Sequence, residues 1–415
     1  MNAGIPFDHL LLIGAGIVGR AIADAHLDAA IPFDLIDNNP QNLAVAGELL
    51  ARPGWKVTPH AAPPFGGSCL RFTQDPVREG TKTLIIESIA ERLDAKRNLL
   101  ADIAAAIGTE FCFASNTSSL RIAEIAAAIR DPERVCGMHF FMPVRGRELV
   151  EVVGAPGTAS RVLEAVSLHA QRLGKRPLRV HDTPGFVVNR ILWPYLNQSL
   201  ALLGAGADHR QISVAAKRCG MPMSPLVLID MIGLRTAFDA GRAAWQAFPK
   251  RIEPSPILPG MIKAGLQGRS GGAGFYSYSP DPMACKEDEL TAASRQVIGK
   301  YLRNERTWSD DEVYLNLAVP MWIEALLVCQ EKLIPDRQTV TDALAGGLGC
   351  NPPGGFWEQF DRLGIERLRK SIELFAPSFK AMNIPASLAQ SLAHSRTLHD
   401  AVQHWLMTTP HPHRA

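Results

Sequence analysis

The sequence has almost no excess of charge of either sign. Its 43 lysines and arginines nearly balance 41 aspartates and glutamates, which leaves a formal net charge of +2. No basic stretch is interleaved with aromatic residues, as is usual in proteins that bind nucleic acid. We therefore predict no nucleic-acid partner.

Long apolar runs are also missing. The apolar stretch Leu10–Ile13 is too short for the central region of a signal peptide. No uncharged run approaches the roughly twenty apolar residues that span a bilayer. The sequence thus predicts no signal peptide, no transmembrane segment and no membrane partner.

Cysteine and histidine are sparse and poorly clustered. The seven cysteines, an odd number, contain no Cys-x-x-Cys pair, which argues against a disulfide framework and for a reducing compartment. His394, His399 and His404 recur at every fifth residue, a spacing that does not align them on one helical face. We expect a cytoplasmic protein without a bound metal.

A glycine motif follows the first predicted strand. The apolar run His9–Ile13 leads into Gly14-Ala-Gly-Ile-Val-Gly19 and then a helix-like segment. In a dinucleotide-binding turn the first glycine makes the tight turn, the second lets the pyrophosphate approach the backbone, and the third lets the helix pack on the strand. The phosphates then meet the positive end of the helix.

A second predicted strand, Phe33–Ile36, ends at Asp37, about twenty residues beyond the motif. A carboxylate at this position accepts hydrogen bonds from both ribose hydroxyls and repels a 2′-phosphate, which favours NAD over NADP. A glycine turn with no ligand is the alternative reading of the motif alone.

The chain is longer than one domain of about 100–200 residues. Strand-like and helix-like segments alternate to about residue 182, which predicts an α/β Rossmann-type doubly wound parallel sheet. Long helical stretches follow. We predict domains at 1–182, 183–282 and 283–415, with strands at 83–86, 111–114 and 149–153 and helices at 91–107, 120–129 and 187–203.

The two helical regions look like repeats of one unit. The run from Pro194 to Leu203 has an echo from Pro320 to Leu327, and the segment that ends at Gly233 has an echo that ends at Gly364. Such repeats could bury against each other the faces that a single-copy relative would bury in a dimer. A monomer is therefore expected, with a homodimer as the alternative.

Three motifs between residues 114 and 153 point to a dehydrogenase. They bring Ser118, Ser119, His139 and Glu151 downstream of the dinucleotide motif. Oxidising a secondary alcohol requires a base for the hydroxyl proton, and imidazole changes protonation near neutral pH. A carboxylate on its other ring nitrogen would fix the tautomer and stabilise the imidazolium. The alternative for His139 is a core histidine after a strand.

These residues carry a family resemblance over nearly the whole chain. Ser-Asn-Thr-Ser-Ser-Leu, Gly-Met-His-Phe-Phe, Asp-Thr-Pro-Gly-Phe-Val-Val-Asn-Arg and Gly-Phe-Tyr resemble motifs of the L-3-hydroxyacyl-CoA dehydrogenases. The second helical repeat makes the chain similar to the dehydrogenase part of the bacterial multifunctional fatty-acid oxidation protein. The resemblance implies a role in fatty-acid metabolism: an NAD-dependent oxidoreductase that interconverts 3-hydroxyacyl and 3-oxoacyl thioesters of CoA or a carrier protein.

The resemblance also implies roles for individual residues. The catalytic histidine and its partner glutamate fall on His139 and Glu151, and two residues near the substrate fall on Ser118 and Asn189. The implied cofactor contacts are Gly14, Gly16, Ile17, Val18, Gly19, Asp37, Asn38, Glu91, Lys96, Asn116 and Ser118. By residue type alone, Glu91 and Lys96 would be a solvated helical pair.

The chain departs from the family pattern in three places. Met142 stands where the family usually has asparagine. Ser270 stands where the family has a cofactor-contacting lysine, and Arg269 lies beside it. Prolines and glycines in 52–67 break the basic helical arm with which the family grips CoA. Two explanations remain: a dehydrogenase for a differently presented acyl group, on a carrier or as a specialised metabolite, or a weak or non-catalytic relative with a binding role.

Overall fold

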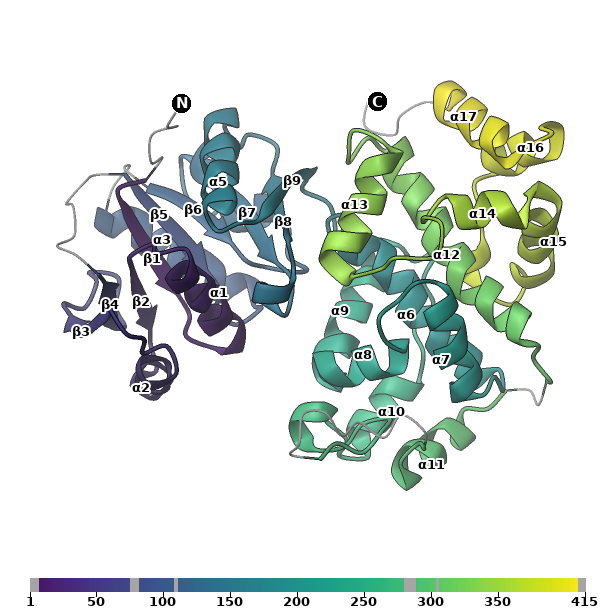
Figure 1. Cartoon of the computed structure of the whole chain (residues 1–415), viewed down its shortest axis with the longest axis horizontal. Helices are drawn as coiled ribbons and strands as arrows, with labels where there is room; N and C mark the ends of the chain where they lie inside the picture. The colour runs from purple at the N-terminus through teal and green to yellow at the C-terminus, as the bar shows by residue number, and fades with distance from the viewer. Residues whose placement is uncertain (1–6, 75–81, 108–110, 280–288, 304–305, 410–415) are drawn as a thin grey trace. The chain divides into compact units, whose positions relative to one another are not determined.

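The chain folds into two compact units, Met1–Phe186 and Val187–Ala415 (Figure 1). The computed structural model describes residues 7–74, 82–107, 111–279, 289–303 and 306–409. Unit 1 holds a mostly parallel sheet and unit 2 is helical, which confirms the predicted fold class. The predicted division after residue 182 lies near the unit boundary, whereas that after residue 282 falls outside the described residues.

Unit 1 is built on a nine-stranded sheet in the order β3-β4-β2-β1-β5-β6-β7-β8-β9. The five strands from β2 to β7 run parallel, so their carboxyl ends meet at one edge. Strand β8 is antiparallel to β7, and β9 is parallel to β8. The strands are β1 His9–Ile13, β2 Phe33–Asp37, β3 Lys56–His60, β4 Ser68–Thr73, β5 Thr83–Glu87, β6 Phe111–Ser115, β7 Val135–Phe140, β8 Leu149–Gly154 and β9 Arg176–His181.

Helices cover both faces of this sheet (Figure 1). The central strands are buried on both sides and read as continuous apolar runs, as expected for parallel strands between helices. Helices α1, α2 and α5 pack over one face, and α3 and α4 lie together on the other. Their bounds are α1 Ile17–Asp28, α2 Pro40–Leu49, α3 Leu93–Ile107, α4 Ile122–Ala126 and α5 Ser160–Arg172.

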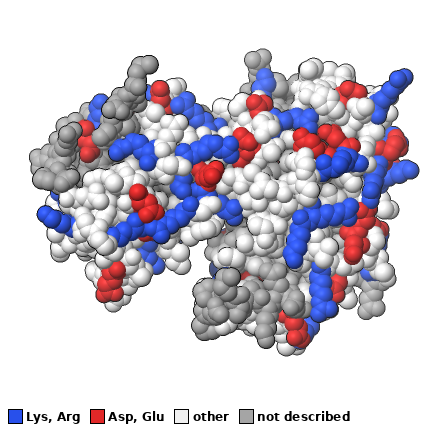
Figure 2. Space-filling model, viewed as in Figure 1, with Lys and Arg blue, Asp and Glu red and all other residues white. Residues whose placement is uncertain are grey.

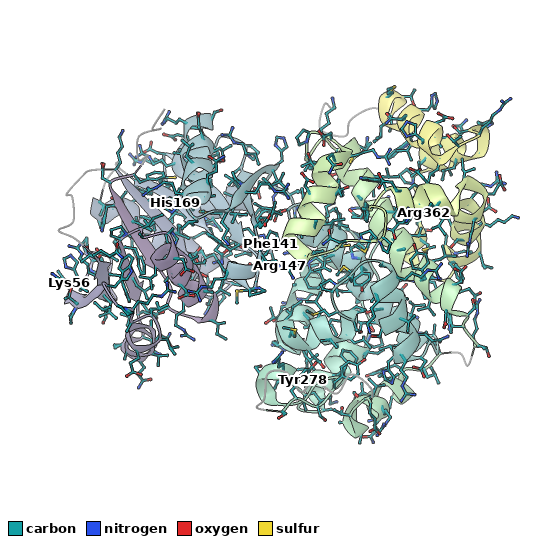
Figure 3. The ribbon with its side chains drawn as sticks, in the orientation of Figure 1. Lys56, Phe141, Arg147, His169, Tyr278 and Arg362 are labelled. Carbon is teal, nitrogen blue, oxygen red and sulfur yellow. The ribbon has the colours of Figure 1, made fainter. Side chains whose placement is uncertain are left out.

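The region of the missing basic arm folds as an antiparallel hairpin. Strands β3 and β4 pair with each other, and β4 pairs with β2, so the hairpin extends the sheet beyond its parallel part. Lys56, labelled in Figure 3, lies on the outermost strand. The sequence predicted that a long helix is broken here, but not these strands, nor β7 and β9. The helix predicted over 120–129 is shorter, and the one predicted from residue 91 begins at Leu93.

Unit 2 is organised around two long helices, α6 (Val188–Gly204) and α12 (Asp310–Gln330). By length and composition α12 could span a membrane, but 89% of the relevant window is buried in the unit, which accounts for its apolar character. The remaining helices are α7 His209–Arg218, α8 Pro225–Ile232, α9 Leu234–Ala247, α10 Ile257–Lys263, α11 Ala292–Lys300, α13 Arg337–Leu348, α14 Glu358–Leu363, α15 Ile365–Phe375, α16 Ala386–His394 and α17 Leu398–Thr408.

The two repeats share backbone details. Both α6 and α12 contain an internal proline, Pro194 and Pro320. A single glycine with positive φ links α8 to α9 and α14 to α15: Gly233 has φ 93° and Gly364 has φ 78°. Only glycine adopts this conformation without strain. These paired features match an internal duplication.

The duplication is also visible in the side chains that join α6 to α12. Arg190 and Asn316 each stand four residues before the internal proline, and Gln198 and Glu324 each stand four residues after it. Arg190 Nε donates to Glu324 Oε1 at 2.6 Å, and Gln198 Nε2 donates to Asn316 Oδ1 at 3.2 Å. One contact is therefore an ion pair and its symmetry counterpart is a neutral amide pair.

The ion pair extends into a buried cluster. Arg190 also donates to both carboxylate oxygens of Glu331 at 2.6 Å, and Arg251 Nε lies 3.1 Å from Glu324 Oε2. Arg190 and Glu324 are each 2% exposed. Because removing one partner leaves an uncompensated buried charge, this cluster ties the two repeats together.

We expect Arg190→Met to lower the free energy of unfolding of unit 2 by about 3–5 kcal/mol, because Glu324 then loses its main partner. Urea denaturation followed by tryptophan fluorescence measures this, since only Trp55 of the seven tryptophans lies in unit 1. Arg295→Met, in an exposed pair with Glu289, should cost less than about 1 kcal/mol. Equal losses in the two variants would contradict the role of the cluster.

Candidate active site

The glycine motif forms the turn between β1 and α1. Gly14 has φ +104°, and a Cβ atom there would lie 2.5 Å from the carbonyl oxygen of Ser88. A Cβ atom on Gly19 would lie 1.8 Å from the carbonyl oxygen of Gly14, so the helix packs too closely for any side chain. At Gly16 a Cβ atom would meet nothing within 4 Å, because this position faces open space.

That open space belongs to a pocket of about 620 Å³ at the carboxyl ends of β1, β2 and β5. Gly14, Gly16, Asp37 and Asn38 line it. Asp37 is 8% exposed and accepts hydrogen bonds from the backbone N–H groups of Ala15 at 2.7 Å and Asn39 at 2.8 Å. Its carboxylate is therefore held at the pocket wall, where it can meet a ribose.

The hairpin also contributes to this pocket. Phe65, Gly66 and Gly67, in the loop between β3 and β4, line it opposite residues of α3. The sequence analysis did not assign these residues a site. The sequence signal for them is the Gly-Gly pair at the end of a proline-rich loop. In the structure, a Cβ atom on Gly67 would lie 3.2 Å from the carbonyl oxygen of Asp37, so a larger residue would be crowded there.

These features fit NAD. The cradle without a side chain at Gly16 suits the pyrophosphate beside the N-terminus of α1, a helix of 12 residues. Asp37 suits the ribose hydroxyls, and the motif opens a helix directly after a strand. When bound, NAD supplies the acceptor and donor of hydride.

His139 and Glu151 face each other on neighbouring strands. They are register partners in the antiparallel pair β7 and β8, so their side chains lie on the same face of the sheet. His139 Nδ1 lies 2.8 Å from Glu151 Oε2, and both residues are buried. Since a carboxylate only accepts, Nδ1 carries the proton, and Nε2 is left as an acceptor in the neutral ring.

The Nε2 atom of His139 lies 3.1 Å from Ser118 Oγ. Aromatic rings hold the imidazole from two sides: Phe141 at 4.6 Å and Phe186 at 5.7 Å between ring centroids, both in edge-on geometry. Figure 3 labels Phe141, which directly follows β7. The ring is thus fixed by a carboxylate, a hydroxyl and two aromatic edges.

Lys96 is buried, which the sequence did not predict. Its side chain is 1% exposed, and its Nζ donates to Glu87 Oε1 at 2.6 Å. Glu87 is the last residue of β5, is 0% exposed, and also accepts from Ser115 Oγ at 2.6 Å and the backbone N–H of Ile89 at 2.7 Å. Glu87 was not predicted from the sequence; the signal for it is an acidic residue at the end of an apolar strand. The implied contact of Lys96 with the cofactor stays a prediction.

Glu91 holds the loop that carries Ser118. Its Oε1 accepts from Thr117 Oγ1 at 2.7 Å and from the backbone N–H groups of Ser118 and Ser119 at 2.9 and 3.0 Å. Burial tends to raise the pKa of Glu91, but the Lys96 ammonium, 3.4 Å from Oε2, and these hydrogen bonds together hold it below its usual range. The charged form of Glu91 therefore orders the loop next to His139.

Asn116 joins three strand ends. Its Oδ1 accepts from the backbone N–H of Phe140 at 2.9 Å, and its Nδ2 donates to Ser88 Oγ at 3.2 Å.

Ile17 and Val18 form the first turn of α1. Asn189 lies in α6 of unit 2, so its predicted place beside His139 stays a prediction.

The motif residues Asp182 and Gly274 have structural roles. Asp182 accepts from the backbone N–H groups of Ile122 and Ala123, both at 2.9 Å, and so caps α4. In unit 2, Asp230 accepts from the N–H groups of Phe275 and Tyr276, and burial raises the pKa of Asp230 to about 6. A Cβ atom on Gly274 would lie 1.9 Å from Asp230 Oδ1, which explains the glycine of Gly-Phe-Tyr.

Two family models match the chain. The NAD-binding domain of 3-hydroxyacyl-CoA dehydrogenase matches residues 9–183, and the C-terminal domain of the same family matches residues 185–278. The protein is therefore an NAD-dependent oxidoreductase that acts on a CH–OH group. It belongs to the 3-hydroxyacyl-CoA dehydrogenase family.

Solved structures share this fold. (S)-3-hydroxybutyryl-CoA dehydrogenase from Ralstonia eutropha is 27% identical, with a TM-score of 0.54 over 66% of this chain and 99% of that chain. 3-Hydroxybutyryl-CoA dehydrogenase from Escherichia coli K12 has a TM-score of 0.70 and 24% identity, over 93% of this chain and 98% of its own. The dehydrogenase part of multifunctional enzyme 1 from C. elegans has a TM-score of 0.57 and 22% identity, over 92% and 88%. The last two show that the same fold extends over both helical repeats.

We expect Lys96→Met to destabilise unit 1 by about 3–5 kcal/mol, because Glu87 becomes a buried carboxylate without its cation. The N–H groups of Ser118 and Ser119 should exchange faster with solvent, measured by hydrogen exchange, since Glu91 loses the same cation. The exposed Lys56→Met serves as the matched control. Adding Glu87→Gln should recover part of the stability; no recovery would show that the loss does not come from the unpaired carboxylate.

Proposed function

We propose that this protein interconverts 3-hydroxyacyl and 3-oxoacyl thioesters with NAD, and that His139 is the general acid and base. The observation that carries the proposal is the chain of contacts Glu151–His139–Ser118, with 2.8 Å on one ring nitrogen and 3.1 Å on the other. It stands at the same edge of the sheet as the NAD pocket. Membership of the family indicates the reaction type, and the contacts of His139 support this residue as the base.

The proton path follows from the tautomer. In the direction of oxidation, His139 Nε2 accepts the proton of the substrate hydroxyl, and the imidazolium is stabilised by Glu151 on Nδ1. In the direction of reduction the same nitrogen returns the proton to the forming alkoxide. We assign Ser118 Oγ, which lies 3.1 Å from Nε2, the role of holding the substrate oxygen. The family resemblance assigns a role near the substrate to Asn189 as well.

The family assignment leaves open which group carries the acyl thioester. The hairpin β3–β4 stands in the region of the basic arm, and its loop lines the pocket for the dinucleotide. This supports an acyl group presented differently from the usual CoA ester, on a carrier protein or as a specialised metabolite. The similar enzymes from Escherichia coli and Ralstonia eutropha are 3-hydroxybutyryl-CoA dehydrogenases, which supports CoA as the alternative.

We further propose that the protein acts as a monomer in the cytoplasm. The buried contacts of Arg190 with Glu324 and of Gln198 with Asn316 occupy the faces that a single-copy relative would offer to a second subunit. The cysteines among the described residues are all free, which suits a reducing compartment. A homodimer is the alternative, and size-exclusion chromatography with light scattering distinguishes the two.

A second candidate is a weak or non-catalytic relative that binds a dinucleotide or an acyl group. Met142, 45% exposed and directly after Phe141, cannot form the hydrogen bonds of an asparagine, which favours this reading. The complete contact chain around His139 supports the catalytic one.

Purified protein should oxidise NADH in the presence of an acetoacetyl thioester, followed by the absorbance of the reduced nicotinamide. We expect His139→Ala to lower turnover by about 10²–10⁴-fold, the usual contribution of a general acid or base. Acetoacetyl-CoA, acetoacetyl carrier protein and a small thioester should be compared side by side. Binding of NADH without oxidation by any of them would support the non-catalytic candidate.

Met142→Asn should raise turnover, because it restores the hydrogen-bonding capacity of the asparagine that the family usually has three residues after the histidine. Met407→Asn is the matched control, since Met407 is an exposed methionine in α17. Steady-state rates with the best thioester decide the outcome. Unchanged or lower turnover in Met142→Asn would show that the site is built around methionine.

A further inference from the structure

A second cavity, of about 340 Å³, lies within unit 2. Its wall joins the carboxyl-terminal part of α6, in the first repeat, to residues 378–381 of the second repeat, and it includes Trp308 and residues that precede it. Because every described lining residue belongs to unit 2, the cavity does not depend on how the units are arranged. None of its described lining residues is among those to which the reaction above is assigned.

The duplication allows the residues around this cavity to be compared with those at the equivalent place in the other repeat. Phe248 and Phe379 each stand fifteen residues after the glycine that links two helices, Gly233 and Gly364. Their backbones match as well: Phe248 N–H donates to Ala244 at 2.9 Å, and Phe379 N–H donates to Phe375 at 2.9 Å. The surroundings of the two phenylalanines are therefore counterparts.

Around Phe248 the space is filled by charged side chains. The guanidinium of Arg190 lies 4.8 Å from the ring centroid, and that of Arg251 lies 4.4 Å from it. Glu324 and Glu331 hold Arg190 in place.

Around Phe379 the counterparts are smaller or uncharged. By position in the repeat, Asn316 corresponds to Arg190, Met382 to Arg251, Ala205 to Glu331 and Gln198 to Glu324. Gln198, Ala205 and Phe379 all line the cavity. At the cavity wall, alanine therefore stands where the other repeat has the carboxylate of Glu331, and a neutral carboxamide stands where it has the carboxylate of Glu324.

The lining defines the chemistry of an occupant. Apolar and aromatic groups form much of the wall, and the buried carboxamide of Gln198, 1% exposed, adds a polar group. Three cations, Arg303, Arg306 and Lys380, stand against one anion, Glu253. The volume is within the range of about 300–1,000 Å³ found for small-molecule sites. The apolar lining residues include Leu200, Ala201, Ile257, Trp308 and Phe379.

We propose that this cavity is a binding site for a small amphiphilic anion, a carboxylate with an apolar body. The apolar body lies against Phe379 and Ala201, and the carboxylate faces Arg303 and Lys380. Arg306 contributes less, because it is already paired with Glu312.

Octanoate tests the proposal, with octylamine as the cationic probe of the same length. Equilibrium dialysis should show octanoate bound by the full chain and by His139→Ala, and octylamine bound at least about tenfold more weakly, the change expected from one charge-assisted contact. Arg303→Gln with Lys380→Gln should weaken octanoate by a similar factor. Ala201→Leu with Ala205→Leu fills the cavity and should abolish binding.

Ala247→Leu, on the exposed end of α9, is the control for added volume and should bind octanoate normally. Circular dichroism verifies that each variant is folded, and the charge variant decides the matter if the filled variant is not. Binding that survives both cavity variants, equal binding of octylamine, or no binding of octanoate at millimolar concentration would overturn the proposal.

Discussion

The candidate site depends on one buried ammonium group. Lys96 Nζ lies between Glu87 at the end of β5 and Glu91 in the following loop. The carboxylate of Glu87 accepts a hydrogen bond from Ser115, and that of Glu91 accepts hydrogen bonds from four groups of the loop in which Ser118 contacts His139. A charge so deeply buried is stable only when paired, so the helix, two strand ends and the loop must form together. The position of His139 relative to the dinucleotide pocket follows from that assembly.

Local patterns in the sequence were sufficient to predict the features that depend on short motifs. The turn at Gly14, the carboxylate at Asp37 and the pairing of His139 with Glu151 are all found as residue type and spacing suggested. The hairpin β3–β4 was missed because its strands are short and because β3 contains Pro59 and is largely exposed, so it lacks the alternation that marks a half-buried strand. The burial of Lys96 was not predicted because a lysine on a helix is usually solvated, and its burial depends on a contact with Glu87, nine residues earlier at the end of β5.

The helical unit was predictable for a different reason. Repetition of the proline and glycine positions is visible in the sequence itself, whereas the contacts between the repeats can be seen only in the structure, where the repeats pack against each other. The acidic and basic groups on the face shown in Figure 2 are scattered over both units, in keeping with the near-zero net charge. The repeat makes Arg190 and Asn316 equivalent in the sequence, but neither composition nor periodicity could have revealed that they bind Glu324 and Gln198 of the other repeat.

That equivalence has an evolutionary consequence. In a symmetric dimer of identical subunits every substitution at the interface enters twice, so both copies of a contact must tolerate it together. Joining the two units in one chain removes this restriction, and the pair Arg190–Glu324 has diverged in chemistry from Gln198–Asn316. One half can then keep the charge network that secures the fold, while the other is free to lose it and acquire a new surface.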